Sequence, residues 1–317
     1  MISISVIIPC HNEKDSVLRC VESVRSDAGG LVDAMVHVVV IDDGSTDGTD
    51  VAVRGAFAEA KVVTSNGSLW WSGAINKGVE FALADRPDYV LLLNNDCVLS
   101  EGTFQRFLDE SKVFPKSILS AVIGDLETGD PVCFGGKFSY QMLDYWVEPL
   151  NTQGSSTAEV DWLPGHTMFA PAGIFAEIGM MDAKNFPQYF GDADFALRAK
   201  RSGYSLRVIS DLLVLNDRSQ TGLSARLSIR PRKLLRILTS RRSWLRLDDN
   251  LKFWWRYRRI FSFKQLLQRY EFIYLTATTR ILDALHVRNA ARTVRQWSRR
   301  VLQRGKGSRR AHGSDPS

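Results

Sequence analysis

The stretch that decides the fold is Ile4-Ser-Val-Ile-Ile-Pro-Cys-His-Asn-Glu13, followed at residues 36–47 by VHVVVIDDGSTD. In both stretches an apolar, β-branched run ends abruptly in polar residues, which is typical of a strand buried on both faces. Residues 61–64 and 89–93 read as two more strands. Helical patterns fill the intervals at 12–27, at 72–85 and from a cap at 45–47 to about residue 60. This alternation predicts an α/β domain with a mostly parallel central sheet.

Polar clusters follow the four strands, at residues 10–13, 42–45, 65–68 and 94–96. Ligands of such sheets bind beyond the carboxyl ends of the strands, so we expect these clusters to line one crevice. Further along, the sequence predicts short strands at 119–123, 132–138 and 160–168. A helix from 190 to about 202 and a strand pair at 206–209 and 212–215 complete the domain.

The charge of the chain divides sharply. The net charge is +6, yet the residues from Arg226 onward hold 24 basic and 5 acidic side chains, against 17 and 30 before them. This break predicts a catalytic domain at 1–225, a basic amphipathic helical region at 226–304 and a disordered tail at 305–317.

Composition indicates a globular, intracellular protein. Hydrophobic residues make up 44% of the chain, and no apolar run reaches the length of a membrane-spanning helix. The first residues lack the features of a signal peptide. Because the four cysteines show no C-x-x-C spacing, we expect neither a zinc site nor a disulfide framework, and a reducing cytoplasmic setting.

Three groups of side chains are candidates for chemistry. Asp96, at the end of a buried strand, can hold a hard divalent cation, although turns also favour aspartate. The adjacent Asp42 and Asp43 can accept hydrogen bonds from a nucleobase or ribose, or cap a helix. Asp192 and Asp194 lie two apart near a helix start, so one can face the crevice while the other supports.

The segment Asn66-Gly-Ser-Leu-Trp-Trp-Ser-Gly-Ala-Ile-Asn76 pairs two indoles with flanking glycines. Indoles stack on the apolar faces of sugar rings, and glycine permits close approach to a ligand. Burial of Trp70 and Trp71 in the core is the alternative.

The chain resembles the family 2 glycosyltransferases, which have the GT-A fold and invert the anomeric carbon. The resemblance spans roughly residues 3–217. It rests on an ordered set of motifs: Val6-Ile-Ile-Pro-Cys-His-Asn-Glu13, Val40-Ile-Asp-Asp-Gly-Ser-Thr-Asp47, Asn66-Gly67, Gly73 to Gly78 with Asn76, Asn94-Asn-Asp96, Pro164-Gly165, Gly191-Asp-Ala-Asp-Phe-Ala-Leu-Arg198 and Gly203-Tyr204.

The resemblance implies a role for each matching residue. Asp192 is the implied catalytic base, and Asp96 the implied ligand of Mg²⁺ or Mn²⁺ on the donor diphosphate. Gly165, His166 and Asp194 are implied on the acceptor side. The implied contacts of the nucleotide sugar are Pro9, His11, Glu13, Asp42, Asp43, Asn66, Trp70, Trp71, Asn76 and Asn95.

Three positions depart from the family pattern. Asn94-Asn95 precedes Asp96 where many members have another aspartate, and Gly191 stands where an acidic residue often precedes the base. Asn216 falls where a metal-binding histidine is frequent, so we expect Asn216 or the neighbouring Asp217 to take its place.

The basic region threads arginines between aromatic residues, as in Leu251-Lys-Phe-Trp-Trp-Arg-Tyr-Arg-Arg-Ile-Phe261. Interfacial helices have this composition, which predicts peripheral attachment to the anionic inner face of the cell membrane. Packing on the catalytic domain is the main alternative; nucleic acid is not expected as a partner.

The resulting hypothesis is a cytoplasmic enzyme of cell-surface polysaccharide synthesis. It transfers a sugar, with rhamnose as the first candidate, from a dTDP- or UDP-linked donor to a saccharide or polyprenyl-linked saccharide. A catalytically impaired sugar-nucleotide-binding protein and a sugar nucleotidyltransferase are the alternatives. No G-x-G-x-x-G follows the first strand, which argues against a dinucleotide-binding oxidoreductase.

Overall fold

The computed structural model describes residues 1–136, 156–217, 231–264, 266, 267 and 270. The expected tail at 305–317 and most of the basic region lie outside these residues. In chain order the elements are β1 (Ile2–Cys10), α1 (Lys14–Ala28), β2 (Ala34–Asp42), α2 (Thr49–Ala56), β3 (Lys61–Thr64), α3 (Trp70–Leu83), β4 (Tyr89–Leu93), β5 (Cys97–Val98), α4 (Thr103–Val113), β6 (Ser117–Asp125), β7 (Pro131–Cys133), β8 (Thr157–Val160), β9 (Thr167–Pro171), α5 (Ile174–Ile178), α6 (Gly191–Arg201), β10 (Ser205–Asn216), α7 (Pro231–Thr239) and α8 (Leu247–Arg256).

The strands form one mixed sheet with the order β3-β2-β1-β4-β9-β6-β10-β5, in which β7 also pairs with β6 and β8 with β10. The first four strands are parallel neighbours, as the alternation of strands and helices predicted. In the other half, β6 and β10 also pair parallel, but antiparallel pairings lie around them. Strand β9 enters antiparallel between β4 and β6, and β5, β7 and β8 are antiparallel as well.

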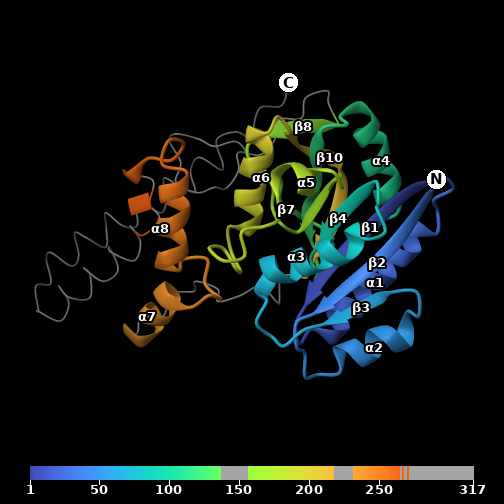
Figure 1. The fold of residues 1–317 in the computed structure, drawn as a ribbon, viewed down its shortest axis with the longest axis horizontal. Helices are drawn as coiled ribbons and strands as arrows, with labels where there is room; N and C mark the ends of the chain where they lie inside the picture. Colours follow the sequence, from blue (N-terminus) through green and yellow to red (C-terminus); the bar gives the residue numbers. More distant parts are fainter. Residues whose placement is uncertain (137–155, 218–230, 265, 268–269, 271–317) are drawn as a thin grey trace, which may run out of the picture.

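Helices cover both faces of the sheet (Figure 1). Because side chains alternate across a strand, Ile4 and Val6 of β1 lie in a core cluster with α1, whereas Ile7 lies in a second cluster with α3. Helix α3 approaches the sheet very closely. A Cβ on its Gly78 would lie 2.3 Å from Cγ2 of Ile7, so only glycine fits there.

The structure changes several of the expected elements. The predicted strand at 160–168 is two strands, β8 and β9, separated by the loop that carries Gly165 and His166. The expected strand pair at 206–215 is one strand, β10, whose register shifts between Ile209 and Leu213. Helices α4 and α5 were not predicted, and the second part of the strand expected at 132–138 lies outside the described residues.

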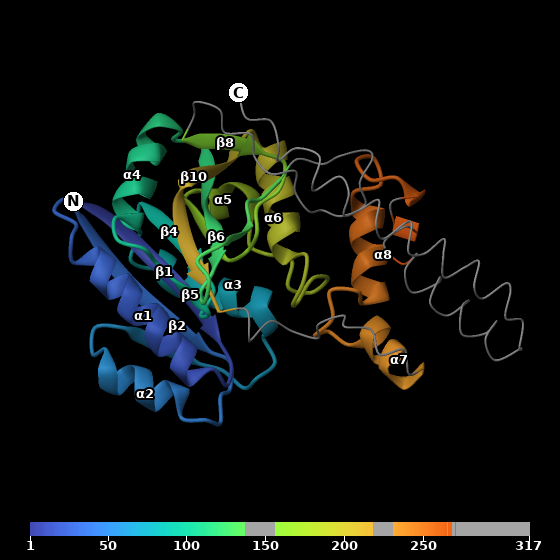
Figure 2. The same cartoon turned by 180° about the vertical axis from the view of Figure 1, so that it is seen from behind.

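The C-terminal helix α8 packs beside α6 (Figures 1 and 2). Phe253 of α8 is fully buried. It shares a core cluster with Phe190, which directly precedes α6, and with Ala193 and Leu197 of α6. Among the described residues no helix combines the length and the apolar character needed to span a bilayer.

Candidate active site

The loops that follow β1 and β2 are hydrogen-bonded to each other. The ring Nδ1 of His11 lies 2.6 Å from the carbonyl oxygen of Asp43 and donates to it, and the Asn12 amide accepts from the backbone N–H of Thr46 at 2.7 Å. The Asn12 N–H donates to the Ser45 hydroxyl at 2.8 Å. Because β1 and β2 are parallel neighbours, both loops lie at the same sheet edge, with Pro9 at the buried end of β1.

Asp42 and Asp43 both bind backbone N–H groups. Asp42 accepts from Ser45 N–H at 2.8 Å. Asp43 accepts from the N–H groups of Gly67, Leu69 and Trp70 at 2.9–3.0 Å, and its side chain is only 6% exposed. The helix-cap alternative therefore describes Asp43, but the helix that it caps is α3 rather than α2. Both carboxylates shape the loops and leave little surface for a nucleobase.

The loop after β4 brings acidic groups together. The side-chain amide of Asn95 donates to Glu13 Oε2. Burial raises the pKa of Glu13. The hydrogen bond from Asn95 lowers this pKa, and the charge of Asp96 raises it. Burial also raises the pKa of Asp96 to about 6. No lysine, arginine or histidine in the described part of the chain pairs with Asp96, so its charge is uncompensated there.

The three residues expected to hold a metal meet at the β5–β10 pair, although 120 positions separate Asp96 from Asn216. The N–H of Asp217 donates to the Asp96 carbonyl oxygen at 2.8 Å. Asn216 is 1% exposed and directs its amide toward Cys97 Sγ and the Asp96 carbonyl, and Asp217 forms an ion pair with Arg19 at 2.8 Å. Asn216 therefore supports Asp96 directly, Asp217 is held by Arg19, and the replacement of the usual histidine by either residue stays a prediction.

The donor set suits a hard cation held chiefly by the substrate. No cluster of three His, Cys, Asp or Glu side chains with ligand geometry occurs among the described residues. Mg²⁺ and similar ions are commonly bound by one or two carboxylates together with substrate phosphates. The buried, uncompensated carboxylate of Asp96 fits that arrangement, with Glu13 as the nearby second acid.

The first turn of α3 carries the tryptophan pair. The indole N–H of Trp71 donates to Asn94 Oδ1 at 2.8 Å, and its backbone N–H donates to Gln188 at 3.2 Å. Trp70 has a left-handed φ of 59°, held by its hydrogen bond to Asp43. Both residues are partly exposed, and Trp71 also packs against the core cluster under α3, so the core alternative holds in part for Trp71. Asn66 lies in the preceding loop and accepts from Ser68.

Asp192 is the first acidic residue of α6 and is fixed by two backbone donors. Its carboxylate accepts from Gly165 N–H at 2.9 Å and from Ala193 N–H at 2.8 Å. Burial raises the pKa of Asp192, the two N–H donors lower it, and nearby His166 lowers it further. A carboxylate with a raised pKa is better matched to proton abstraction near neutral pH.

Asp96 and Asp192 belong to one region of the protein. Strands β4 and β9 pair antiparallel, so the end of β4 meets the start of β9. There the N–H of Asn94 donates to the carbonyl oxygen of His166 at 3.0 Å, two residues before Asp96. The neighbour of His166, Gly165, donates to Asp192. One short loop, Gly165–His166, therefore connects Asp192 to the strand end that precedes Asp96, and Trp71 packs against Gly165 of this loop.

The loop at Gly165 has no room for a side chain. A Cβ there would lie 3.0 Å from the Trp71 ring and 3.1 Å from Asp192 Oδ2. The imidazole Nδ1 of His166 is buried and has no hydrogen-bond partner within the described residues. Burial lowers the pKa of His166, and the charge of nearby Asp192 raises it.

Gly191 has a steric explanation. A Cβ at this position would lie 2.1 Å from the hydroxyl oxygen of Ser72, which donates to the carbonyl of Phe186 at 2.6 Å. The acidic residue that often precedes the base in the family cannot fit while Ser72 is present.

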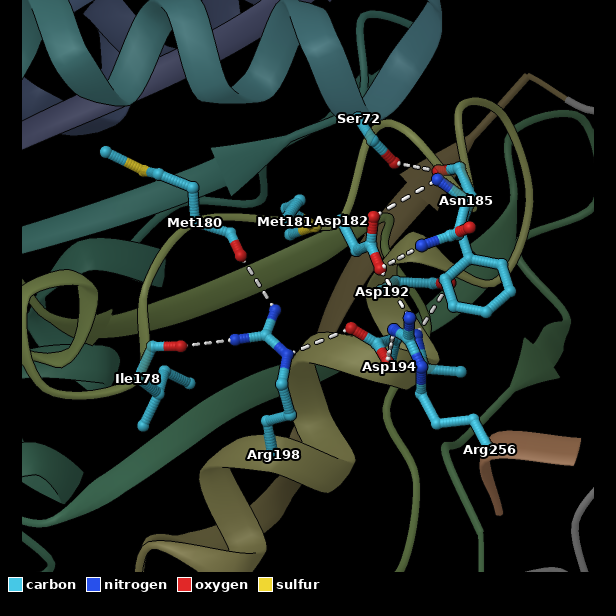
Figure 3. Close-up of polar contacts among 12 residues, drawn as sticks. Ser72, Ile178, Met180, Met181, Asp182, Asn185, Asp192, Asp194, Arg198 and Arg256 are labelled. Carbon is cyan, nitrogen blue, oxygen red and sulfur yellow. Dashed lines mark hydrogen bonds and ion pairs between the residues drawn. The ribbon is translucent and has the colours of Figure 1, made fainter. Parts of the chain in front are cut away.

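Two predicted site residues have structural positions instead. Asn76 uses its amide to pair with both backbone groups of Met181 at 2.9 Å, which ties α3 to the turn before α6. Asp194 is 0% exposed and binds Arg198 and Arg256 (Figure 3), and it also accepts from the Tyr257 hydroxyl. It supports α6 and does not face the acceptor side.

Several residues at the site were not found from the sequence. Arg19, Ser72 and Gln188 have ordinary helix or loop contexts, and their partners lie 114–198 positions away. The same holds for Arg256 of α8, which lies 62 positions from Asp194. The sequence held one indication of these contacts, the many arginine and aromatic residues after residue 226, for which packing on the catalytic domain was an alternative.

Comparison with known proteins agrees with this geometry. Residues 5–151 match the model of the family described as Glycosyl transferase family 2. Glucosyl-3-phosphoglycerate synthase of Mycolicibacterium smegmatis is 40% identical over 67 residues, 21% of this chain and 20% of that protein. N-acetylglucosaminyl-diphospho-decaprenol L-rhamnosyltransferase of Mycobacterium tuberculosis is 23% identical over 209 residues, 59% of this chain and 68% of that protein.

Solved structures show the same fold. TarS 1–349 of S. aureus matches with a TM-score of 0.52 at 16% identity, over 68% of this chain and 60% of that one. The mannosyltransferase PcManGT from Pyrobaculum calidifontis, in complex with GDP-Man and Mn²⁺, matches with a TM-score of 0.52 at 17% identity, over 78% and 63%. Residues 5–151 therefore match the family 2 glycosyltransferase domain, and the described residues have the GT-A fold.

Proposed function

We propose that the protein is an inverting glycosyltransferase that moves a sugar from a nucleoside diphosphate to a hydroxyl acceptor. The observation that supports the proposal is that the Gly165–His166 loop is hydrogen-bonded both to Asp192 and to Asn94, which lies two residues before Asp96. One carboxylate lacks a cation partner among the described residues, and the other has a raised pKa. A sugar diphosphate between them would meet a cation site on one side and a base on the other.

The proposed reaction is a single displacement. The acceptor oxygen bonds to the anomeric carbon on the face opposite the leaving diphosphate, the bond to the diphosphate oxygen breaks, and the acceptor proton passes to Asp192. The N–H groups of Gly165 and Ala193 orient the carboxylate for this transfer. Asp96, with Glu13 nearby, would hold Mg²⁺ or Mn²⁺, which supplies positive charge to the departing diphosphate.

The donor side is proposed to lie over the loops after β1, β2 and β4. Among the residues predicted to contact the donor there, His11 is exposed and Asn95 and Trp71 are partly exposed. A dTDP- or UDP-linked deoxysugar is the first candidate donor. The likeness to a relative named as a decaprenol-linked L-rhamnosyltransferase supports rhamnose, and a polyprenyl-linked saccharide as acceptor.

The test is a screen of nucleotide sugars for diphosphate release with and without Mn²⁺, followed by Asp192→Asn on the donor found. A positioned base contributes about 10²–10⁴ in rate, so we expect turnover to fall by that factor with donor affinity unchanged. Asp85→Asn, at an exposed residue in the turn after α3, is the control. Full activity of Asp192→Asn would refute the assignment.

A binding protein without catalysis is the second candidate, because Asn216 replaces a frequent metal ligand and is buried against Cys97. Such a protein would bind a nucleotide sugar, but it would neither transfer nor hydrolyse the sugar at any Mn²⁺ concentration. A sugar nucleotidyltransferase would instead form a nucleotide sugar from a nucleoside triphosphate.

We further propose that the basic region attaches the enzyme to the inner face of the cell membrane. Apolar side chains of its described part are exposed: Leu235, Leu247, Leu251, Trp255, Phe263 and Leu267. Arg258 lies over the Trp255 ring at 4.4 Å. Each basic residue near an anionic surface contributes about 1 kcal/mol, and indoles favour the headgroup level.

Sedimentation with phosphatidylserine-containing vesicles tests this attachment. We expect binding that falls with salt and is weakened by Leu251→Ser with Trp255→Ser. Val113→Ser, at an equally exposed apolar residue of α4, is the matched control. Absence of binding to anionic vesicles would remove the membrane proposal and leave the transferase proposal intact.

A further inference from the structure

Asp194 is a buried carboxylate whose partners come from two distant parts of the chain. It lies in the first turn of α6, two residues after Asp192, and its side chain is 0% exposed. Arg198 of the same helix donates to Oδ2 at 2.9 Å. From α8 and the residue after it, Arg256 donates to Oδ1 at 2.8 Å and the Tyr257 hydroxyl donates at 2.7 Å.

Arg256 reaches a second acid with its other guanidinium nitrogen. It donates to Asp182 at 2.6 Å, and its plane lies 4.9 Å from the Phe186 ring (Figure 3). Asp182 belongs to the turn that precedes α6 and that Asn76 of α3 holds through Met181. One side chain of α8 therefore clamps the helix that carries Asp192 to the turn before it.

Apolar contacts reinforce the clamp. Phe253 of α8 stacks on Phe190 at 4.8 Å and meets Phe186 edge-on at 5.8 Å. Phe190 directly precedes α6 and has a left-handed φ of 68°, a conformation that a bulky residue adopts only when its surroundings enforce it. The aromatic contacts of α8 thus fix the point at which α6 begins.

We propose that Arg256 and Tyr257 are positioning residues for the transfer reaction, and that α8 completes the catalytic domain by aiming Asp192. The inference rests on the proposed role of Asp192 as the base. The Asp192 carboxylate is held by Gly165 N–H at 2.9 Å, a contact that depends on where the first turn of α6 lies. Release of Asp194 would let that turn shift, and a shift of about 1 Å at a reacting group can lower the rate about 100-fold.

The experiment compares Arg256→Gln, Arg256→Lys and Tyr257→Phe in the full chain, with activity normalised to folded protein by circular dichroism. We expect Arg256→Gln to lower kcat about 10- to 100-fold while KM for the donor stays within about twofold. Tyr257→Phe keeps the ring contacts and loses one donor, so its kcat should fall less. Arg256→Lys restores the charge without bridging both acids, so it should recover only part of kcat.

Lys252→Gln is the matched control, because Lys252 is a basic residue of the same helix that forms an ion pair with exposed Asp248 at 3.0 Å and does not contact Asp194 or Asp182 within the described residues. Combining Arg256→Gln with Asp194→Asn should lower kcat no further than the single changes, since both release the same clamp. Tyr257→Phe guards against an Arg256 variant that does not fold.

Asp192→Asn, measured in parallel, separates the two proposals. If it retains turnover, the proposed function fails. If it is inactive while folded Arg256→Gln and Tyr257→Phe keep normal kcat, the positioning inference is overturned and α8 serves stability alone.

Discussion

The contact between Gly191 and Ser72 predicts that Gly191→Ala lowers the free energy of unfolding. Removal of one atom, the Ser72 hydroxyl oxygen, should reverse this effect. Alanine at 191 would place a methyl group 2.1 Å from the Ser72 hydroxyl oxygen and 3.3 Å from the Phe186 carbonyl oxygen. The hydroxyl has no room to move, because Ser72 is 0% exposed and donates to that carbonyl at 2.6 Å. Overpacking of this kind costs about 1–3 kcal/mol, so we expect Gly191→Ala to lower the free energy of unfolding by that amount.

The same change should be neutral or stabilising in a Ser72→Ala background. Removing the hydroxyl leaves the Cβ of residue 72 at 3.4 Å from the new methyl group, an ordinary contact. Ser72→Ala alone loses one hydrogen bond, worth about 1 kcal/mol. Alanine is then favoured over glycine within a helix by about 0.5–1 kcal/mol.

Urea unfolding of the wild type, both single variants and the double variant measures the coupling. We expect a coupling free energy between the two sites of about 1–3 kcal/mol. Turnover should follow, because residue 191 adjoins Asp192: it should fall in Gly191→Ala and recover in the double variant. An equal cost of Gly191→Ala in both backgrounds would show that the hydroxyl is not the obstacle.

Asp192→Asn and Asp194→Asn should change stability in opposite directions at neutral pH, as measured by urea midpoints. Burial raises the native pKa of Asp192 above that of the unfolded chain, so the wild type loses stability as pH rises through the native pKa. The asparagine variant does not ionise and should therefore be more stable than the wild type at neutral pH. This difference in stability should disappear toward pH about 4, the pKa of an unfolded aspartate. Asp194→Asn weakens buried ion pairs and should destabilise by at least about 1 kcal/mol. Asp43→Asn removes the charged cap of α3 and should cost about 1–2 kcal/mol with a change in tryptophan fluorescence; an unchanged midpoint would contradict the cap. Asn76→Ala should lower the midpoint by losing both hydrogen bonds to Met181, yet leave donor affinity of the folded protein unchanged, because both amide atoms of Asn76 are bound to Met181.

The sequence was sufficient where a signal is local. Apolar β-branched runs predicted β3 and β4 with their observed bounds and β1 and β2 to within two residues. The polar residues that end these strands were correctly expected at one sheet edge, since parallel neighbouring strands end on the same side. The ordered motifs also predicted the GT-A fold, because several of them lie at the carboxyl ends of the same parallel strands.

Only the tertiary structure decided which side chains face the reaction and which support it. Asp43 and Asn76 carry the same motif signal as His11 and Asn95, but their partners show that they hold α3 in place. Asp192 and Asp194 are equivalent in sequence, and packing of α8 from 62 positions away makes one a buried anchor and leaves the other at the site. Local patterns fix backbone direction through neighbours a few residues apart, whereas the identity of a hydrogen-bond partner follows from which distant surfaces pack together.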